Sequence, residues 1–169
     1  NVEKCILREA VVMQMTWPGA PTVYYGDEAG MVGWTDPDNR RSYPWGKQDW
    51  ELIEFHKDMI RIHKKYECFR SGSYKSIASG SHWICYGRFN KKLQAVILIN
   101  NRREMLTVDL PIWQIGILEN ACLKRVIQTT QSTYNIGEVM ERAEDGILHV
   151  TVGPQTASVY IAAKNVEEN

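Results

Sequence analysis

The segment Pro21–Gly26 constrains the possible folds of this chain more than any other part of its sequence. It is short and rich in β-branched and aromatic residues, and its apolar side chains stand next to one another instead of alternating with polar ones. This composition is typical of a strand buried on both faces, as in a parallel sheet covered by helices. One helix–strand–helix unit cannot bury such a strand alone, so the segment predicts further β/α units upstream of these 169 residues.

Helical patterns flank the predicted strand on both sides. Residues 3–15 carry apolar side chains at helical spacings, and a Pro-Gly pair ends that pattern. Residues 50–66 form a second amphipathic pattern, for which Asp49 is a suitable N-cap. A stretch rich in glycine and proline lies between them over residues 26–48. Loops of this length in a compact domain are usually functional.

The second half of the sequence predicts β structure, because apolar residues alternate with polar ones between turn signals. Seven strands are expected: Tyr74–Ala78, His82–Phe89, Leu93–Asn100, Met105–Leu110, Lys124–Gln128, Ile147–Val152 and Ala157–Ala162. Short strands with such separators indicate an antiparallel sandwich. Residues 111–122 and 129–145 fit either loop or irregular strand. The expected fold is therefore α+β, with a helix–strand–helix portion over residues 1–70 and an all-β sandwich over residues 71–169.

Composition excludes several classes of protein. Lysine plus arginine equals aspartate plus glutamate at 20 each, which argues against a nucleic-acid partner. No apolar run reaches the ~18 residues that a membrane-spanning helix needs. The four cysteines form no C-x-x-C pair, so we expect free thiols, no metal site and no cofactor. Free thiols favour a reducing compartment and hence a cytoplasmic location. The chain begins with Asn1 and reads directly into a helix, so a natural N-terminus is not expected here.

Several sequence motifs together resemble those of one enzyme family. Pro18–Glu28 closely resembles the motif that forms the last strand of the (β/α)₈ barrel in α-amylase-family glycoside hydrolases. Asp36–Arg41 is similar to the neopullulanase, cyclomaltodextrinase and maltogenic amylase branch, although Trp34 and Ser42 depart from its pattern. The later segments resemble the last barrel helix and a C-terminal β-sandwich that ends with Ala157–Ile161. The chain is thus identified as similar to the C-terminal part of such an enzyme.

This resemblance implies a retaining hydrolase that acts on α-glucans such as starch or maltooligosaccharides. Such enzymes use a nucleophile carboxylate and an acid/base carboxylate ~5–5.5 Å apart, and in this family a third carboxylate holds sugar hydroxyls. All three lie at the ends of barrel strands four, five and seven, and this chain starts after strand seven. We therefore expect no catalytic residue in it, and no activity from the chain alone.

Asp36 and Arg40 are the candidate substrate-binding residues. The resemblance implies that they bind glucose units, and their chemistry suits this role, since a carboxylate accepts and a guanidinium donates hydrogen bonds. The alternative is that Asp36 caps a turn and forms a surface ion pair with Arg40. Trp34 is a further candidate for stacking on a sugar ring, whereas Trp45 is expected to pack under the loop.

The adjacent pair Asp27-Glu28 is expected to be structural. Neighbouring residues on an extended chain point in opposite directions, so the two carboxylates cannot converge on one glycosidic oxygen.

Two other functions remain open from the sequence. A carbohydrate-binding module would need an aromatic platform, but Trp83, Tyr86 and Phe89 do not alternate onto one face. A purely structural sandwich is the third reading. In a closed barrel Thr22–Tyr25 would be an interior strand, so its edges would be open in this chain, and open edges are templates for another chain. We therefore expect copies to associate through residues 1–70.

Overall fold

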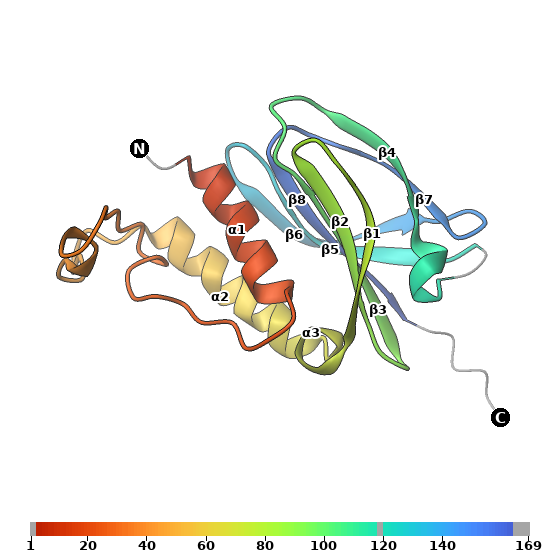
Figure 1. The fold of residues 1–169 in the computed structure, drawn as a ribbon, viewed down its shortest axis with the longest axis horizontal. Helices are drawn as coiled ribbons and strands as arrows, with labels where there is room; N and C mark the ends of the chain where they lie inside the picture. The colour runs from red at the N-terminus through yellow and green to blue at the C-terminus, as the bar shows by residue number, and fades with distance from the viewer. Residues whose placement is uncertain (1–2, 118–119, 164–169) are drawn as a thin grey trace.

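The computed structural model describes residues 3–117 and 120–163, which form three layers (Figure 1). Two helices, α1 (Lys4–Thr16) and α2 (Trp50–Lys65), cover one face of a six-stranded sheet. A two-stranded sheet covers part of the other face. Three short helices complete the elements: η1 (Asp38–Arg40), α3 (Cys68–Ser71) and η2 (Ile112–Ile115).

Both sheets are antiparallel throughout. The larger sheet has the strand order β1-β2-β3-β8-β5-β6, so consecutive strands pair only in part. Its strands are β1 (Ser73–Gly80), β2 (Trp83–Phe89), β3 (Leu93–Asn100), β8 (Thr156–Ala163), β5 (Cys122–Thr129) and β6 (Tyr134–Arg142). The smaller sheet pairs β4 (Leu106–Pro111) with β7 (Ile147–Val152).

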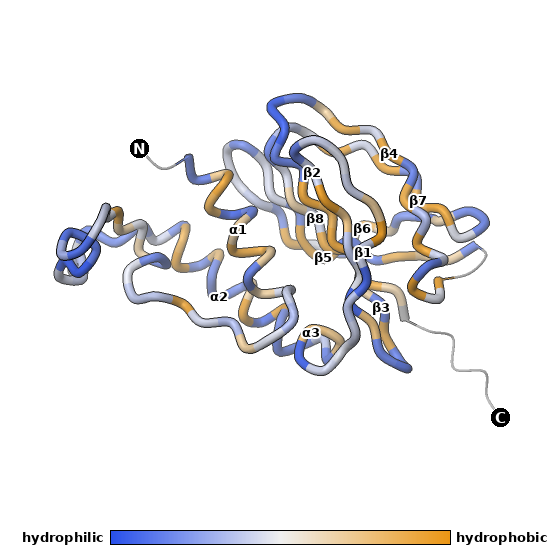
Figure 2. The backbone as a smooth tube through the Cα atoms, in the orientation of Figure 1, coloured by the Kyte–Doolittle hydropathy of each residue, from blue (hydrophilic) through white to orange (hydrophobic). Residues whose placement is uncertain are grey.

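The centre of the larger sheet is buried on both faces, and this follows from the sequence of β3. Ala95, Ile97 and Ile99 lie in the hydrophobic cluster under the helices. Val96 and Leu98 alternate with them and lie in the cluster between the two sheets. A strand with two buried faces is apolar along its buried length, as residues 95–99 are, and Figure 2 shows hydrophobic segments gathered at the centre of the larger sheet.

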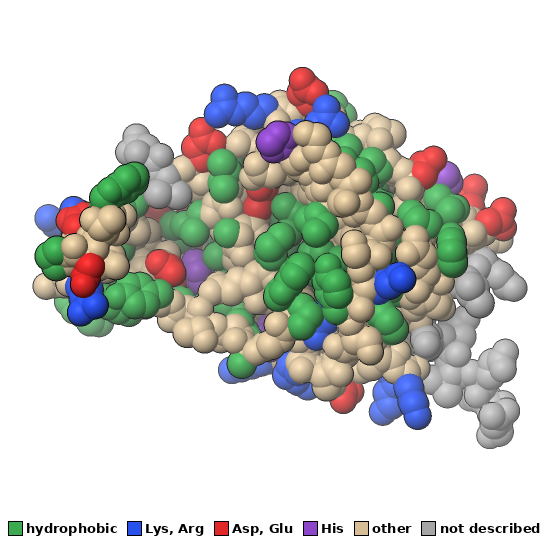
Figure 3. Space-filling model, in the orientation of Figure 1, with side chains coloured by type: hydrophobic (Ala, Val, Ile, Leu, Met, Phe, Trp, Pro, Cys, Tyr) green, Lys and Arg blue, Asp and Glu red, His purple; other side chains and the backbone are tan. Residues whose placement is uncertain are grey.

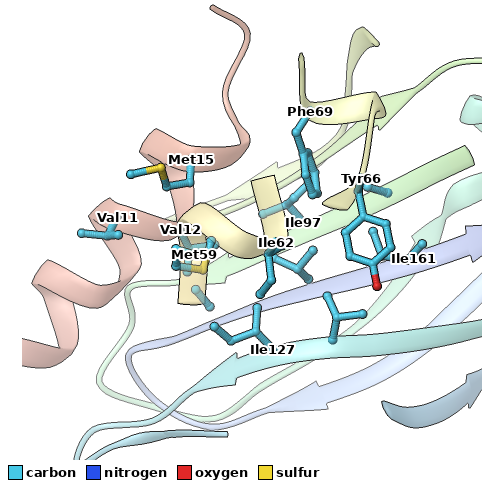
Figure 4. Packing of buried hydrophobic residues seen from close by; sticks show 14 of the residues in the cluster. Val11, Val12, Met15, Met59, Ile62, Tyr66, Phe69, Ile97, Ile127 and Ile161 are labelled. Atoms are coloured by element: carbon cyan, nitrogen blue, oxygen red, sulfur yellow. The ribbon is translucent and has the colours of Figure 1, made fainter. Parts of the chain in front are cut away.

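The helices and the sheet share one hydrophobic core (Figure 4). Val12 and Met15 of α1 and Met59 of α2 are almost completely buried in it. They pack against the sheet, where Ile97 and Ile127 line the opposite wall. Each fully buried side chain of this size contributes roughly 1.5–3 kcal/mol, so the core joins the helices firmly to the strands.

Most of the predicted elements are confirmed. Both helices and all seven predicted strands are present, with bounds that differ by one or two residues, and β3 and β7 have the predicted bounds. The β-sandwich fold class is confirmed as well. One further strand, β6, lies in the range left open at 129–145. It is an edge strand with most side chains exposed, so it lacks the alternation that marks a half-buried strand.

The strand predicted at Pro21–Gly26 is not formed in this structure. The segment up to Tyr24 is irregular, and residues 25–30 make turns. A strand needs a hydrogen-bonded neighbour, and no residue of 3–117 or 120–163 forms a ladder with this segment. The local sequence is that of a buried strand, but the partners that would define it are not among the described elements.

Candidate functional site

The long loop over residues 26–48 extends from one end of the molecule (Figure 1). Its first turn requires a glycine at position 26, where φ is +94° and an added Cβ would lie 2.2 Å from Sδ of Met31. Its end is fixed to its beginning, because the backbone N–H of Asp49 donates to the carbonyl oxygen of Ala29 at 3.1 Å. The Asp49 side chain also caps α2 by accepting from the Leu52 N–H at 3.2 Å. The root of the loop is therefore anchored on the helices.

Asp36 and Arg40, the two predicted site residues, lie together in this loop. Nε of Arg40 lies 2.9 Å from Oδ1 of Asp36, and the two side chains are 69% and 58% exposed. Asp36 lies two residues before the short helix η1 and Arg40 is its last residue, so the ion pair spans this turn of the chain. An exposed ion pair of this kind contributes little to stability. The arrangement leaves polar atoms of both side chains open to solvent.

A second ion pair, which the sequence analysis missed, holds the same loop together. Nε of Arg41 donates to Oδ1 of Asp38 at 2.9 Å, and Oδ2 of Asp38 accepts from the backbone N–H of Trp34 at 3.1 Å. These hydrogen bonds, the one from Arg41 first, lower the pKa of Asp38. The carboxylate therefore stays ionised and connects both ends of the turn around Asp36. The spacing of Asp38 and Arg41, three residues apart, is the signal that could have revealed it.

The aromatic residues of the loop are strongly exposed. Trp34 is 84% exposed and Trp45 is 80% exposed. The expectation that Trp45 packs under the loop is wrong: its ring lies against that of Tyr43, with centroids 4.6 Å apart, and is otherwise in solvent. The loop extends away from the body, so nothing described covers this tryptophan. Figure 3 shows hydrophobic side chains gathered on this end of the molecule.

An open hollow of about 990 Å³ separates the loop from the beginnings of the two long helices. Met31 and Trp34 line it from the loop, and Leu7 and Leu52 from α1 and α2. Asp27 also lines it, and burial is the main reason why the pKa of Asp27 is raised, with the charge of Glu28 adding to the effect. Glu28 turns back and accepts from the Gly26 N–H at 2.9 Å, which is a contact within the turn.

Neither a metal site nor a membrane span is found in the described part of the chain. Residues 3–117 and 120–163 contain no group of three histidine, cysteine or acidic side chains that could hold a metal ion. No helix within these ranges has the length and apolar character to cross a bilayer. All four cysteines are free, and Cys5, Cys68 and Cys85 are buried.

The chain is similar in sequence to several α-glucan hydrolases, although no protein-family model matches it. It is 39% identical over 82 residues to an amylopullulanase of Thermoanaerobacter thermohydrosulfuricus, covering 48% of this chain and 6% of that protein. It is 36% identical over 113 residues to neopullulanase 2 of Thermoactinomyces vulgaris, covering 64% and 19%. A cyclomaltodextrinase of Thermoanaerobacter pseudethanolicus is 32% identical over 123 residues, covering 70% and 21%. The chain thus spans about a fifth or less of the length of these relatives.

Solved structures match nearly all of the fold. The crystal structure of an Anoxybacillus α-amylase matches 96% of this chain and 33% of its own with a TM-score of 0.76 and 26% identity. An α-amylase from Geobacillus thermoleovorans, complexed with acarbose, matches 96% of this chain and 34% of its own with a TM-score of 0.80 and 24% identity. The resemblance stated from the sequence is therefore confirmed by relatives and by structural neighbours of the same family.

Proposed function

We propose that this chain, which resembles the C-terminal part of α-amylase-family glycoside hydrolases in sequence and fold, belongs to a retaining enzyme that hydrolyses α-glucosidic bonds. The observation that carries this proposal is the similarity to cyclomaltodextrinase. The aligned stretch of 123 residues is longer than either predicted portion of this chain, 1–70 or 71–169. Similarity to a glycosidase therefore includes residues of both the helical portion and the sandwich. In such an enzyme, residues 1–70 are the end of the catalytic barrel and residues 71–169 are the C-terminal domain.

In the parent enzyme the chain supplies one wall of the substrate cleft and stabilises the barrel. The catalytic carboxylates lie in the upstream part, and Asp36 and Arg40 bind hydroxyls of a glucose unit. Their ion pair uses Oδ1 of Asp36 and Nε of Arg40, and no hydrogen bond within the described ranges uses Oδ2 of Asp36 or the Nη atoms of Arg40. These atoms supply an acceptor and donors side by side, which matches a pair of sugar hydroxyls.

The test of this function is hydrolysis by the complete parent. The purified parent should release reducing sugar from starch, pullulan, cyclodextrin or maltooligosaccharides, whereas the purified 169-residue chain should release none. Activity of the isolated chain above a buffer control would contradict the placement of the catalytic carboxylates upstream. An inactive but folded parent would contradict the function itself.

The sandwich by itself is a weaker candidate for carbohydrate binding. Tyr86 is buried under the helices, and Trp83 and Phe89 pack against the cluster on the other face of the sheet. These three aromatic residues therefore form no shared platform. Calorimetric titration of the chain with maltooligosaccharides separates the two readings, since a binding module would give a saturable signal.

Two further proposals concern the chain in solution. Copies associate through residues 1–70, where Thr22–Tyr25 lacks a strand partner and Tyr24 and Tyr25 are exposed. The protein is also cytoplasmic, a location that suits its free thiols. Chromatography with light scattering tests the first proposal, and cell fractionation tests the second.

A further inference from the structure

An apolar groove lies between α1 and the turn that joins β1 to β2. We call it the α1–hairpin groove, and its volume is about 390 Å³. Its lining residues are Ile6, Glu9, Ala10, Met13, Gly80, His82, Trp83, Ile84, Ile99 and Asn101. Most of the wall is aliphatic or aromatic, and Glu9 and His82 are the only ionisable side chains in it.

Glu9 is the unusual member of this wall. Its side chain is only 3% exposed. Oε2 accepts a hydrogen bond from Nδ2 of Asn101 at 2.6 Å. Oε1 is buried as well, and it has no hydrogen-bond partner among the described residues. A buried polar atom without a partner costs free energy, and a charged one costs more.

Neither Arg8 nor His82 forms an ion pair with Glu9 in the described part of the chain. Arg8 is its neighbour in sequence, but Arg8 is directed to the other side of α1, where it bonds to Oε1 of Glu51 at 3.1 Å and to the Thr130 carbonyl oxygen at 3.2 Å. His82 lies at the exposed rim of the groove and makes no ion pair within the described ranges. Glu9 therefore lines the groove with a buried oxygen, Oε1, that has no donor among the described residues.

We propose that a lysine or arginine side chain from the part of the parent enzyme preceding this chain occupies the α1–hairpin groove and pairs with Oε1 of Glu9. This inference rests on the proposed function. Long basic side chains bury an aliphatic stem and present a charge at its end. The groove suits such a side chain, because Ile84 and Ile99 can contact the aliphatic stem and Glu9 can pair with the charge.

The origin of the occupant follows from the lengths of the relatives. The chain spans about a fifth or less of three relatives, so most of a similar enzyme lies outside these residues. The proposed function places the rest of the barrel upstream, and α1, which forms part of the groove, is the described helix nearest in sequence to that upstream part. A sugar fits less well, because a pyranose needs polar partners around its ring and this wall is mostly apolar.

The pKa of Glu9 is consistent with a carboxyl group that has no cationic partner among the described residues. Burial raises the pKa of Glu9 to about 7, against the lowering effect of the hydrogen bond from Asn101. A cation in the groove would favour the ionised carboxylate and bring the pKa down.

The experiment compares Glu9→Gln in two proteins, the 169-residue chain and the complete parent. In the chain, the change removes an unpaired carboxylate, so the thermal midpoint should stay level or rise by roughly 2–4 °C. In the parent, it leaves a buried cation unpaired, so the midpoint should fall. Glu67→Gln is the matched control, because Glu67 is exposed and makes no ion pair among the described residues. It should change neither midpoint.

Equal midpoint shifts for Glu9→Gln in the chain and in the parent would mean that no upstream cation reaches Glu9. A chain that dimerises, and whose dimer is lost in Glu9→Gln, would assign the groove to a second copy. Failure of the Glu9→Gln parent to fold, while Glu67→Gln folds, would be the largest form of the expected loss. Sugar release by the parent is read separately, so an inactive parent contradicts the proposed function and leaves the comparison of midpoints valid.

Discussion

Nη1 of Arg88 donates a 2.7 Å hydrogen bond to the carbonyl oxygen of Thr16, the last residue of α1. Nη2 of the same guanidinium donates to the carbonyl oxygen of Gly72 at 3.0 Å. Arg88 is buried on β2, so one side chain of the sandwich satisfies two carbonyl groups at the junction with the helices. The carbonyl groups at the end of a helix have no partner within the helix, and this contact supplies one of them.

Arg88→Ala should therefore destabilise the chain by about 2–4 kcal/mol. The change removes hydrogen bonds from a charged donor and leaves space in a packed region. Urea denaturation followed by circular dichroism measures the free energy of unfolding. Arg142→Ala is the control, because Arg142 is exposed on β6 and makes no ion pair within residues 3–117 and 120–163. Equal stability of the two variants would show that the Arg88 contacts are not what joins the layers.

Asp36→Ala and Arg40→Ala in the parent should each lower kcat/KM for maltooligosaccharides by roughly one to two decades. A hydrogen bond to a charged group contributes about 1.5–3 kcal/mol, and this loss appears in kcat/KM when the contact is present in the transition state. Lys47→Ala is the control, since Lys47 is exposed in the same loop. Unchanged kinetics in both Asp36 and Arg40 variants, with an intact fold by circular dichroism, would mean that the pair only shapes the loop.

The stability of the isolated chain should depend on pH through Glu9. The pKa of Glu9 is raised from 4.5 to about 7 in the folded chain. Between these values the folded state holds a proton that the unfolded state has lost, so the free energy of unfolding falls as pH rises from 4.5 to about 7 and levels off above it.

Denaturant titrations across this range, for wild type and Glu9→Gln, isolate that contribution, because the variant cannot titrate at position 9. The wild type should lose stability relative to the variant as pH rises. His82→Gln is a second control, since His82 lines the same groove. A difference between wild type and Glu9→Gln that does not change with pH would contradict the raised pKa.

The sequence predicts those strands whose own pattern of apolar and polar side chains shows which of their faces are buried. The apolar run of β3 and the alternation of β7 were sufficient for their bounds. The segment Pro21–Gly26 predicts a strand from the same kind of evidence, but a strand exists only with a hydrogen-bonded neighbour. The sequence does not predict β6, for the converse reason: its neighbour β5 defines it, while its own side chains are mostly in solvent.

Among the site residues too, the sequence predicts local contacts and does not predict contacts between distant parts of the chain. The contact between Asp36 and Arg40 is local, and the spacing of the two residues was enough to suggest it. The hydrogen bond to Glu9 comes from Asn101, which is 92 residues away along the chain, and no local pattern contains that information. On the sequence alone, Glu9 is one more polar residue of an amphipathic helix.

The last prediction concerns the unpaired segment Thr22–Tyr25. Nε2 of Gln14 donates to the Thr22 carbonyl oxygen at 2.6 Å, so that residue faces α1. Backbone groups of successive residues in an extended chain point to opposite sides, so we expect those of Val23 to face outward. We expect the chain to form dimers by antiparallel pairing at this edge, measured by light scattering in the micromolar range. Val23→Pro removes the outward N–H and should give a monomer, whereas Val23→Ala keeps the N–H and should still dimerise. A wild-type chain that is monomeric under these conditions, or a dimer that Val23→Pro leaves unchanged, would show that this edge does not bring two copies together.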